Sequence, residues 1–310
     1  MIRDLPALLL SGLAFRRTLT AASLIALGAN GASAGEIVKQ VGRVTFRVET
    51  VYAFPGGVVV VRLGSRGRLG SAWALLDGRK VPFYSDGAGP HALVPVPVEA
   101  VPGPATLGIE IAGRRGEQRI PIPVEIAPRA YPSRAVALPE AKRSLLTRPE
   151  VDHDGRRLLA WLRTESHAAP GPLAAPVRLA AGSGFGESRS YGDATAVESR
   201  IDGLLGEYHR GLEYAVPAGG EVRAPATASV LFAGALVLSG RTVVLDHGQG
   251  IVSVLLHLSR IEAREGDRVT PGTLLGYSGE SGLAPEPIVE WRVYLHGVAV
   301  DPLVLQQILG

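Results

Sequence analysis

The residues of this sequence that could do chemistry are histidines and glutamates in its C-terminal part. His209 and Glu213 stand four residues apart in "HRGLEY". Positions i and i+4 of an extended segment face the same side, so these two side chains can converge. His257 lies in "LLHLSR" and Glu290 in "PIVEWRV". Metal binding and proton transfer are the chemistry that imidazole and carboxylate groups could perform at these positions.

Several other classes of chemistry are excluded by the composition. The 310 residues include no cysteine, which excludes a disulfide framework, a thiolate metal site and a lipid-modified cysteine anchor. No Rossmann, P-loop or serine-hydrolase elbow motif occurs. The net charge of +3 could favour binding to anionic wall or membrane surfaces, but a charge of this size is more typical of an ordinary solvated protein surface. No basic stripe interleaved with aromatics appears, so nucleic acid is not an expected partner.

The remaining five histidines fit structural positions better than ligand positions. His247 in "LDHGQG" is expected to shape a turn. His296 lies at a hairpin turn beyond the strand that carries Glu290, so it cannot replace a missing ligand. We expect four of the five to be exposed: His91, His153, His167 and His296.

From about Gly182 to Leu305 the sequence resembles the lysostaphin/LytM-type zinc metallopeptidases, which cut peptide cross-links in bacterial cell walls. The segments that match, in order, are "SGFG", "HRGLEY", "VRAPATASVLFAG", "VVLDHGQG", "LLHLSR", "EGDRVTPGTLLGYSGESG" and "VDP". "HRGLEY" stands where the family has His-x-Gly-x-Asp. The resemblance covers roughly the C-terminal two-fifths of the chain. It implies a compact β-domain of the barrel-sandwich hybrid type, the duplicated hybrid motif.

The resemblance also implies a role for each candidate site residue. The family binds zinc with a His and an Asp of its first motif and with the second His of Pro-His-x-His. Carried over, these ligands are His209, Glu213 and Glu290. His257 aligns with one catalytic histidine, and Ile288 stands in the place of the other. A catalytic zinc needs three such ligands and leaves a fourth place for water.

Three departures from the family pattern weigh against ordinary catalysis. Glu213 is one methylene longer than the usual Asp, which shifts the carboxylate by over ~1 Å where a site tolerates about half of that. Two carboxylates in the ligand set also weaken the acidification of a zinc-bound water. Ile288 cannot donate a proton, and a general acid–base group contributes ~100- to 10,000-fold.

Three functions are open at this point. The favoured hypothesis is an exported, catalytically degenerate LytM-type protein of the cell envelope that binds peptidoglycan or regulates cell-wall hydrolases, and it need not bind zinc. The alternative is an active metal-dependent peptidoglycan endopeptidase that uses His209, Glu213 and Glu290 and could prefer manganese or another harder metal. The third is a two-domain β protein that serves as a structural or docking module.

The elements that must position these residues are expected to be short strands. With 39 glycines, 23 prolines and 5% aromatics, the composition favours many strands joined by turns, hence an all-β fold. Residues 35–127 predict an immunoglobulin-like β-sandwich of about seven strands. Residues 128–176 predict a linker with one short helix, capped by Asp152 or Asp154. Residues 177–310 predict the LytM-type domain.

Residues 1–34 are typical of an export signal. Basic residues precede the apolar run "TLTAASLIALG", and "ASA" at 32–34 fits the small-x-small cleavage pattern. The run falls short of the ~20 residues that span a bilayer, which argues against a transmembrane anchor. The Arg16-Arg17 pair leaves twin-arginine export as an alternative to ordinary secretion. We expect the mature protein in the periplasm or cell envelope of a bacterium, without a stable membrane span.

Overall fold

The computed structural model describes residues 35–42, 44–65, 71–87, 89–113, 116–135, 137–178, 182, 184–190 and 208–310. The expected export signal at residues 1–34 lies outside these ranges. The described residues belong to one compact unit within residues 32–310, whose fold follows. Among the described residues, no helix combines the length and the apolar composition needed to cross a membrane.

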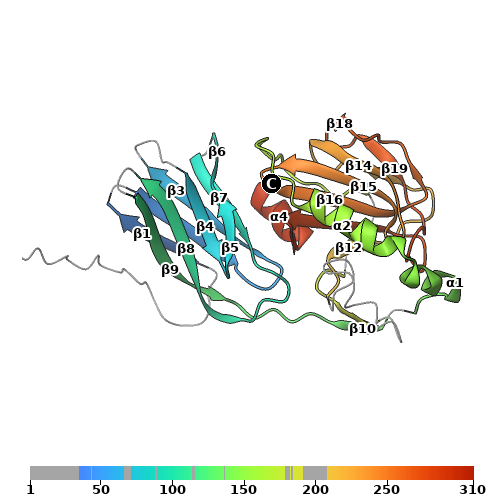
Figure 1. Cartoon of the computed structure of the whole chain (residues 1–310), viewed down its shortest axis with the longest axis horizontal. Coiled ribbons are helices and arrows are strands. Elements are labelled where there is room, and N and C mark those ends of the chain that lie inside the picture. The colour runs from blue at the N-terminus through green and yellow to red at the C-terminus, as the bar shows by residue number, and fades with distance from the viewer. Residues whose placement is uncertain are drawn as a thin grey trace, which may run out of the picture. The chain divides into compact units, whose positions relative to one another are not determined.

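Two antiparallel sheets make up the N-terminal part of this unit, drawn in blue to green in Figure 1. The first has the order β1 (Glu36–Val41), β2 (Val44–Tyr52), β3 (Val58–Ser65), β7 (Gly89–Pro95) and β6 (Tyr84–Asp86). The second has the order β5 (Arg79–Pro82), β4 (Ala72–Leu76), β8 (Gly103–Gly113) and β9 (Gly116–Ile126). Apolar side chains of both sheets share one buried core, among them Phe46, Val61, Leu107 and Ile122. The expected two-sheet sandwich is therefore present, and its immunoglobulin-like topology stays a prediction.

The strand β9 shows how the sequence pattern produces this sandwich. From Ile120 to Ile126 its residues alternate between buried and exposed, so that Ile120, Ile122 and Val124 point into the core while the residues between them face solvent. Two of these solvent-facing residues are Pro121 and Pro123, which lack the backbone N–H of a sheet ladder. The prolines are tolerated because β9 is the edge strand of its sheet.

The predicted linker contains the first helices among the residues that the structure describes. Its elements are β10 (Ser133–Ala135), α1 (Glu140–Arg143), the 3-10 helix η1 (Ser144–Thr147) and α2 (Glu150–Leu162). The predicted helix is confirmed by α2, but the predicted caps Asp152 and Asp154 are wrong, because the helix begins at Glu150 and includes both. Asp154 instead accepts a hydrogen bond from the backbone N–H of Val237 at 2.8 Å, which ties α2 to the C-terminal strands.

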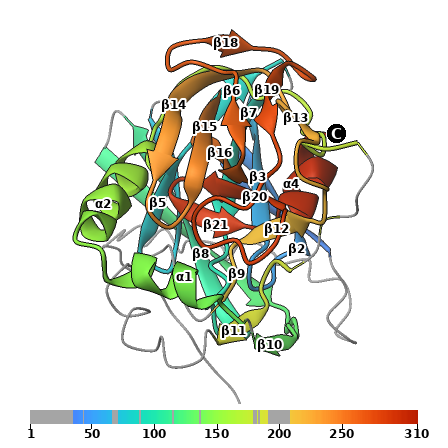
Figure 2. The ribbon, with the colours of Figure 1, turned by 90° about the vertical axis from the view of Figure 1, so that its right-hand side faces the viewer.

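The C-terminal part is built on a larger and a smaller sheet (Figure 2). The larger sheet has the order β12 (Gly211–Tyr214), β20 (Val289–Leu295), β16 (Ile251–Leu258), β15 (Gly240–Gly248), β14 (Ala228–Leu236) and β18 (Arg268–Val269), with β21 (Val298–Val300) paired to β20. The smaller sheet holds β13 (Glu221–Arg223), β19 (Leu274–Tyr277) and β17 (Arg260–Ile261). Outside both sheets, β11 (Ser188–Ser190) pairs with β10, and α4 (Pro302–Leu309) ends the chain. Strands dominate and the three α-helices of the described residues are short, which confirms the all-β prediction.

The larger sheet is covered on both faces, and this decides the environment of the candidate site. On one face, side chains such as Trp291 and Val293 enter the main C-terminal core. On the other face, Leu158 and Leu162 of α2 pack with Tyr294 and other apolar residues of the sheet, so that α2 lies beside β14 in Figure 2. As a result, β16 and β20 are buried along their whole length.

Candidate functional site

The pairing of three strands brings the candidate ligands together. Glu213 on β12 lies directly opposite Glu290 on β20, and Leu256 on β16 lies opposite Glu290 on its other side. Side chains opposite one another in a sheet share a face, so both carboxylates point the same way. His209 Nε2 lies 3.1 Å from Glu290 Oε1 and 3.8 Å from Glu213 Oε1. The predicted trio is therefore assembled, with one ligand atom of each residue within 4.8 Å of the others.

Backbone hydrogen bonds hold His209 just ahead of β12. The N–H of His209 donates to the carbonyl of Glu187 at 2.8 Å, and the N–H of Gly186 donates to the carbonyl of His209 at 2.8 Å. These contacts fix a histidine that belongs to no strand, and its side chain is buried. The segment at 184–187, part of the predicted entry into the domain, thus positions the first candidate ligand.

A local distortion of β16 turns the side chain of His257 toward the same group of candidate ligands. The pairing of β15 with β16 shifts register between Arg241 and Val243, and His257 has a positive φ of 67°. An irregularity of this kind turns a side chain out of the regular alternation. His257 Nδ1 donates to the carbonyl oxygen of Ser281 at 2.8 Å, and Nε2 lies 3.2 Å from Glu290 Oε2. The nitrogen that a general base would present to water therefore faces a carboxylate.

Arg292 is a partner of Glu290 that was not predicted from the sequence. The two residues stand two apart on β20 and share a face, and Arg292 Nε lies 2.5 Å from Glu290 Oε1. Glu290 is 3% and Arg292 9% exposed, so this ion pair is buried. The spacing of two in a strand was a readable signal for it.

The charges of this pair stabilise each other. Burial alone would raise the pKa of the Glu290 carboxyl, but the charge of Arg292, with contributions from His257 and His209, holds it well below its usual range. Burial alone would lower the pKa of the Arg292 guanidinium, and Glu290 outweighs that effect and raises it. Both groups are therefore charged in the folded protein.

A glycine on the neighbouring strand makes room for this pair. Gly211 lies opposite Arg292 on β12. A Cβ atom at this position would meet Arg292 Cγ at 2.8 Å, Glu290 Oε1 at 2.9 Å and the carbonyl oxygen of Trp291 at 3.0 Å. These distances are shorter than ordinary van der Waals contact, so the buried pair depends on the absence of a side chain at 211.

Glu213 faces a second guanidinium, which comes from the linker. Arg134 on β10 has Nη1 3.7 Å from Glu213 Oε2. The Arg134 side chain is 52% and the Glu213 side chain 19% exposed, so water screens this contact more than the one between Glu290 and Arg292. Each carboxylate of the candidate trio therefore has an arginine of its own.

The fit of a catalytic zinc to these residues can be judged from spacing and from charge. Zinc–ligand bonds of ~2.0–2.2 Å place tetrahedral ligand atoms about 3.3–3.6 Å apart, close to the two distances measured from His209. The charge does not fit, because an Arg292 nitrogen lies 2.5 Å from the Glu290 oxygen that would hold the ion. A dication there would be repelled by a fixed positive charge. Ile288, which the resemblance places where the family has a second catalytic histidine, is buried and offers no donor side chain.

Of the four histidines predicted to be exposed, two are exposed and two are buried. His153 and His167 are exposed, as predicted. The prediction of exposure is wrong for His91, which is 7% exposed and whose buried Nε2 finds a partner 3.0 Å away in the Oε1 of Gln249. It is also wrong for His296, whose side chain is 8% exposed and whose Nδ1 lies 2.7 Å from a carboxylate oxygen of Glu165.

The prediction for His247 is wrong as well. His247 is the penultimate residue of β15, and the turn that follows it has positive φ at Gly248, Gln249 and Gly250. Its ring is buried between the carbonyl of Thr227 and the hydroxyl of Ser253. It therefore serves as a hydrogen-bonded core residue.

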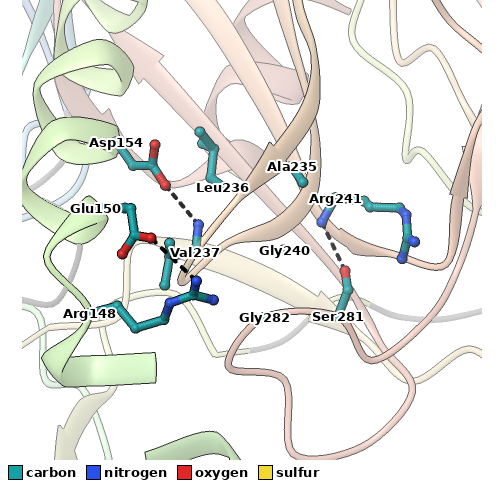
Figure 3. Close-up of a pocket in the computed structure, with 10 residues that line it drawn as sticks. All are labelled: Arg148, Glu150, Asp154, Ala235, Leu236, Val237, Gly240, Arg241, Ser281 and Gly282. Carbon is teal, nitrogen blue, oxygen red and sulfur yellow. Dashed lines mark hydrogen bonds and ion pairs between the residues drawn. The ribbon is translucent and has the colours of Figure 1, made fainter. Parts of the chain in front are cut away.

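A cavity of about 480 Å³ adjoins the residues that support His257 (Figure 3). Arg148, Glu150 and Asp154 line it from the linker side. Ser281 lines the opposite side, where its hydroxyl oxygen accepts a hydrogen bond from the backbone N–H of Arg241 at 2.9 Å. The lining residues are Arg148, Glu150, Asp154, Ala235, Leu236, Val237, Gly240, Arg241, Ser281 and Gly282. None of His209, Glu213 and Glu290 belongs to the lining, so this cavity is not the candidate site.

Comparison with known proteins gives consistent results. Residues 207–302 match the profile of Peptidase family M23. The DD-carboxypeptidase/endopeptidase Mpg of Neisseria meningitidis serogroup B is 32% identical over 95 residues, which are 31% of this chain and 22% of that protein. The peptidoglycan DD-endopeptidase ShyA of Vibrio cholerae is 28% identical over 95 residues, again 31% and 22%. The match thus spans about a fifth of the length of these relatives.

The chain also resembles a solved structure over most of its length. A Pseudomonas aeruginosa protein assigned to peptidase M23 superposes with a TM-score of 0.59 at 27% identity, and the match covers 82% of this chain and 95% of that one. The resemblance to lysostaphin/LytM-type metallopeptidases is therefore confirmed, and with it the fold of the C-terminal part. Residues 207–302 of this protein are a domain of Peptidase family M23.

Proposed function

We propose that this protein is exported to the bacterial cell envelope, where its M23 domain binds peptidoglycan, or a cell-wall hydrolase that it regulates, without cutting peptide bonds. The observation that carries this proposal is the environment of Glu290. The residue in the place of a zinc-binding histidine is paired with Arg292 at 2.5 Å and faces His257 at 3.2 Å. The site residues are thus engaged with one another.

The cell wall is the substrate class that the relatives suggest. Two of them are named as a DD-carboxypeptidase/endopeptidase and as a peptidoglycan DD-endopeptidase. A domain that retains the fold and loses the chemistry can still recognise the same polymer, because binding and bond cleavage use different groups. The proposed organisation is an export signal at 1–34, a spacing or docking sandwich at 35–127, a linker at 128–176 and the wall-binding domain at 177–310.

Hydrolysis would lack two contributions at this site. Ile288 offers no proton donor, and a general acid–base group is worth ~100- to 10,000-fold in rate. His257 directs Nε2 to Glu290, so it would have to leave that carboxylate before it could accept a proton from water. These two features support binding without turnover.

Sedimentation with purified peptidoglycan tests the proposal. Mature protein should pellet with the polymer and should release no soluble muropeptides, whether zinc, manganese or neither is added. A protein that stays in the supernatant would instead fit a structural or docking module that does not contact the wall. In that case, capture of a purified cell-wall amidase or endopeptidase decides whether the regulatory half of the proposal survives.

One observation favours a second candidate function, a metal-dependent peptidoglycan endopeptidase with a variant site. His209, Glu213 and Glu290 present ligand atoms within 4.8 Å of one another. In this alternative the carboxylates would hold manganese or zinc and His257 would orient the water. Muropeptide release that depends on added metal and is lost in Glu290→Ala would establish the alternative and refute the first proposal.

A further inference from the structure

We infer that the guanidinium of Arg292 stands in for the metal ion of this site, as an internal cation bound to Glu290, the carboxylate that His209 and Glu213 also face. The inference deepens the proposed function and rests on its claim that the domain does not hydrolyse. It names the residue that keeps the site closed to metals.

The oxygens of Glu290 are already occupied. Oε1 lies 2.5 Å from Arg292 Nε and 3.1 Å from His209 Nε2, and Oε2 lies 3.2 Å from His257 Nε2. A carboxylate offers about four lone-pair sites, and three of them face nitrogen atoms here. A metal ion at Oε1 would have to displace the guanidinium, which is buried.

The charge of the site is balanced without an ion. Glu213 and Glu290 stand directly opposite each other, an arrangement in which like charges repel. Arg292 compensates Glu290 within the protein, and Arg134 compensates Glu213 at the surface. A divalent ion added to two carboxylates and two guanidinium groups would leave an excess of positive charge in a buried place, which is costly.

Two substitutions of Arg292 separate the effect of its positive charge from the effect of its planar guanidinium group. Arg292→Gln removes the positive charge and keeps a hydrogen-bonding side chain, whereas Arg292→Lys keeps the charge and loses the planar guanidinium. Arg129→Gln is the matched control, because it removes another arginine from a carboxylate, Asp301, at 2.9 Å. Asp301 does not belong to the trio of candidate ligands.

The measurement is zinc and manganese content of the mature chain after dialysis against each ion, with titration to obtain affinity. We expect no stoichiometric ion in the wild type, in Arg292→Lys or in Arg129→Gln. Arg292→Gln should gain affinity for zinc by at least ~100-fold, because a unit charge beside the ion no longer opposes it. Its thermal unfolding temperature should then rise on addition of zinc.

Three outcomes would overturn the inference. One bound ion per chain in the wild type shows that Arg292 does not exclude metal. An Arg292→Gln variant that binds no more metal than the wild type shows that another feature does. If Arg292→Gln fails to fold in metal-free buffer, its refolding with zinc supports the inference, and its failure to refold with zinc counts against it.

The proposed function is tested separately from this inference. Sedimentation with peptidoglycan reports binding of the polymer and not of an ion, so a wild type that holds zinc can still pellet without cleaving. Conversely, a wild type that holds no metal and stays in the supernatant would leave Arg292 as the internal cation and would remove only the wall-binding proposal.

Discussion

The strands β9 and β20 place their charged residues in opposite environments. In β9, buried apolar residues alternate with exposed ones, and Glu125 points to solvent. In β20 every residue is buried, yet the strand carries both Glu290 and Arg292. One strand lies at the edge of a sheet with one wet face, and the other has a core on each side.

The difference teaches what a charge needs at each place. On β9 a carboxylate keeps its hydration and needs no partner. On β20 a carboxylate has lost its water, so its stability depends on groups within hydrogen-bonding distance. A buried ion pair is not a large net gain over a well-packed apolar pair, but the loss of one partner is severe. Removal of one charged partner from β20 should therefore lower the free energy of unfolding far more than removal of a charge from β9.

The largest expected effect is that of Glu290→Gln. This nearly isosteric change removes the carboxylate from Arg292 and should lower the free energy of unfolding by ~3–5 kcal/mol. Urea denaturation followed by circular dichroism measures it. The matched control, Glu125→Gln on β9, should stay within ~0.5 kcal/mol of the wild type. Equal effects of the two substitutions would erase the contrast between the strands.

The position of Glu290 could be predicted from the sequence, but its partner was not. The resemblance to the peptidase family assigns His209, Glu213 and Glu290 to one site, and the structure brings their ligand atoms together. The spacing of two also places Arg292 on the same face as Glu290. Whether that face is wet or dry depends on Leu158 and other residues of a linker helix far away in sequence. Local pattern carries no information on such burial.

The same limit explains the errors at the other histidines. His91 lies in a strand of the N-terminal sheets, where exposure is a reasonable expectation. It is buried in contact with Gln249, a residue 158 positions later that provides its hydrogen-bonding partner. The all-β class and the helix α2 could be predicted because they follow from turn composition and from helical periodicity, which are local properties. Contacts between distant segments are not.

The next effect in size is a dependence on pH at His247 of β15, a strand that is also buried along most of its length. Burial lowers the pKa of His247 to about 4. The unfolded chain protonates this ring below pH ~6.5 while the folded chain does not, so stability falls as the pH drops from ~6.5 toward 4. The loss attributable to this ring should reach ~3 kcal/mol, at about 1.4 kcal/mol per pH unit.

The pH effect is measured as a difference between variants, because other groups titrate in the same range. Urea unfolding of the wild type and of His247→Gln at pH 7, 5 and 4 gives the part of the slope that belongs to His247. His153→Gln is the control, since His153 is exposed on α2 and its removal should leave the slope unchanged. A slope that survives in His247→Gln would show that burial of this ring is not its cause.

A smaller effect is expected at Gly211, which makes room for the buried charges. Gly211→Ala places a methyl group against Arg292 Cγ and Glu290 Oε1 and should cost ~1–3 kcal/mol through overpacking. Gly64→Ala on β3 is the matched control, because its Cβ would come no closer than 3.7 Å to a neighbour. It should leave the unfolding free energy within ~0.5 kcal/mol of the wild type. If Gly211→Ala is as mild, the ion pair can shift along β20.

The smallest effect is expected at Arg134, which lies near the second carboxylate of the site. Arg134→Gln removes a half-exposed cation 3.7 Å from Glu213 and should change stability by less than ~1 kcal/mol, with the difference shrinking at high salt. Glu213 and Glu290 face each other across two paired strands, so both stand on extended, hydrogen-bonded backbone. A mild Arg134→Gln beside a severe Glu290→Gln would place the cause in hydration, because only the carboxylate on β20 has lost its access to water. An equally severe Arg134→Gln would mean that the two carboxylates share one buried network, and the contrast would then lie between the whole site and the sandwich.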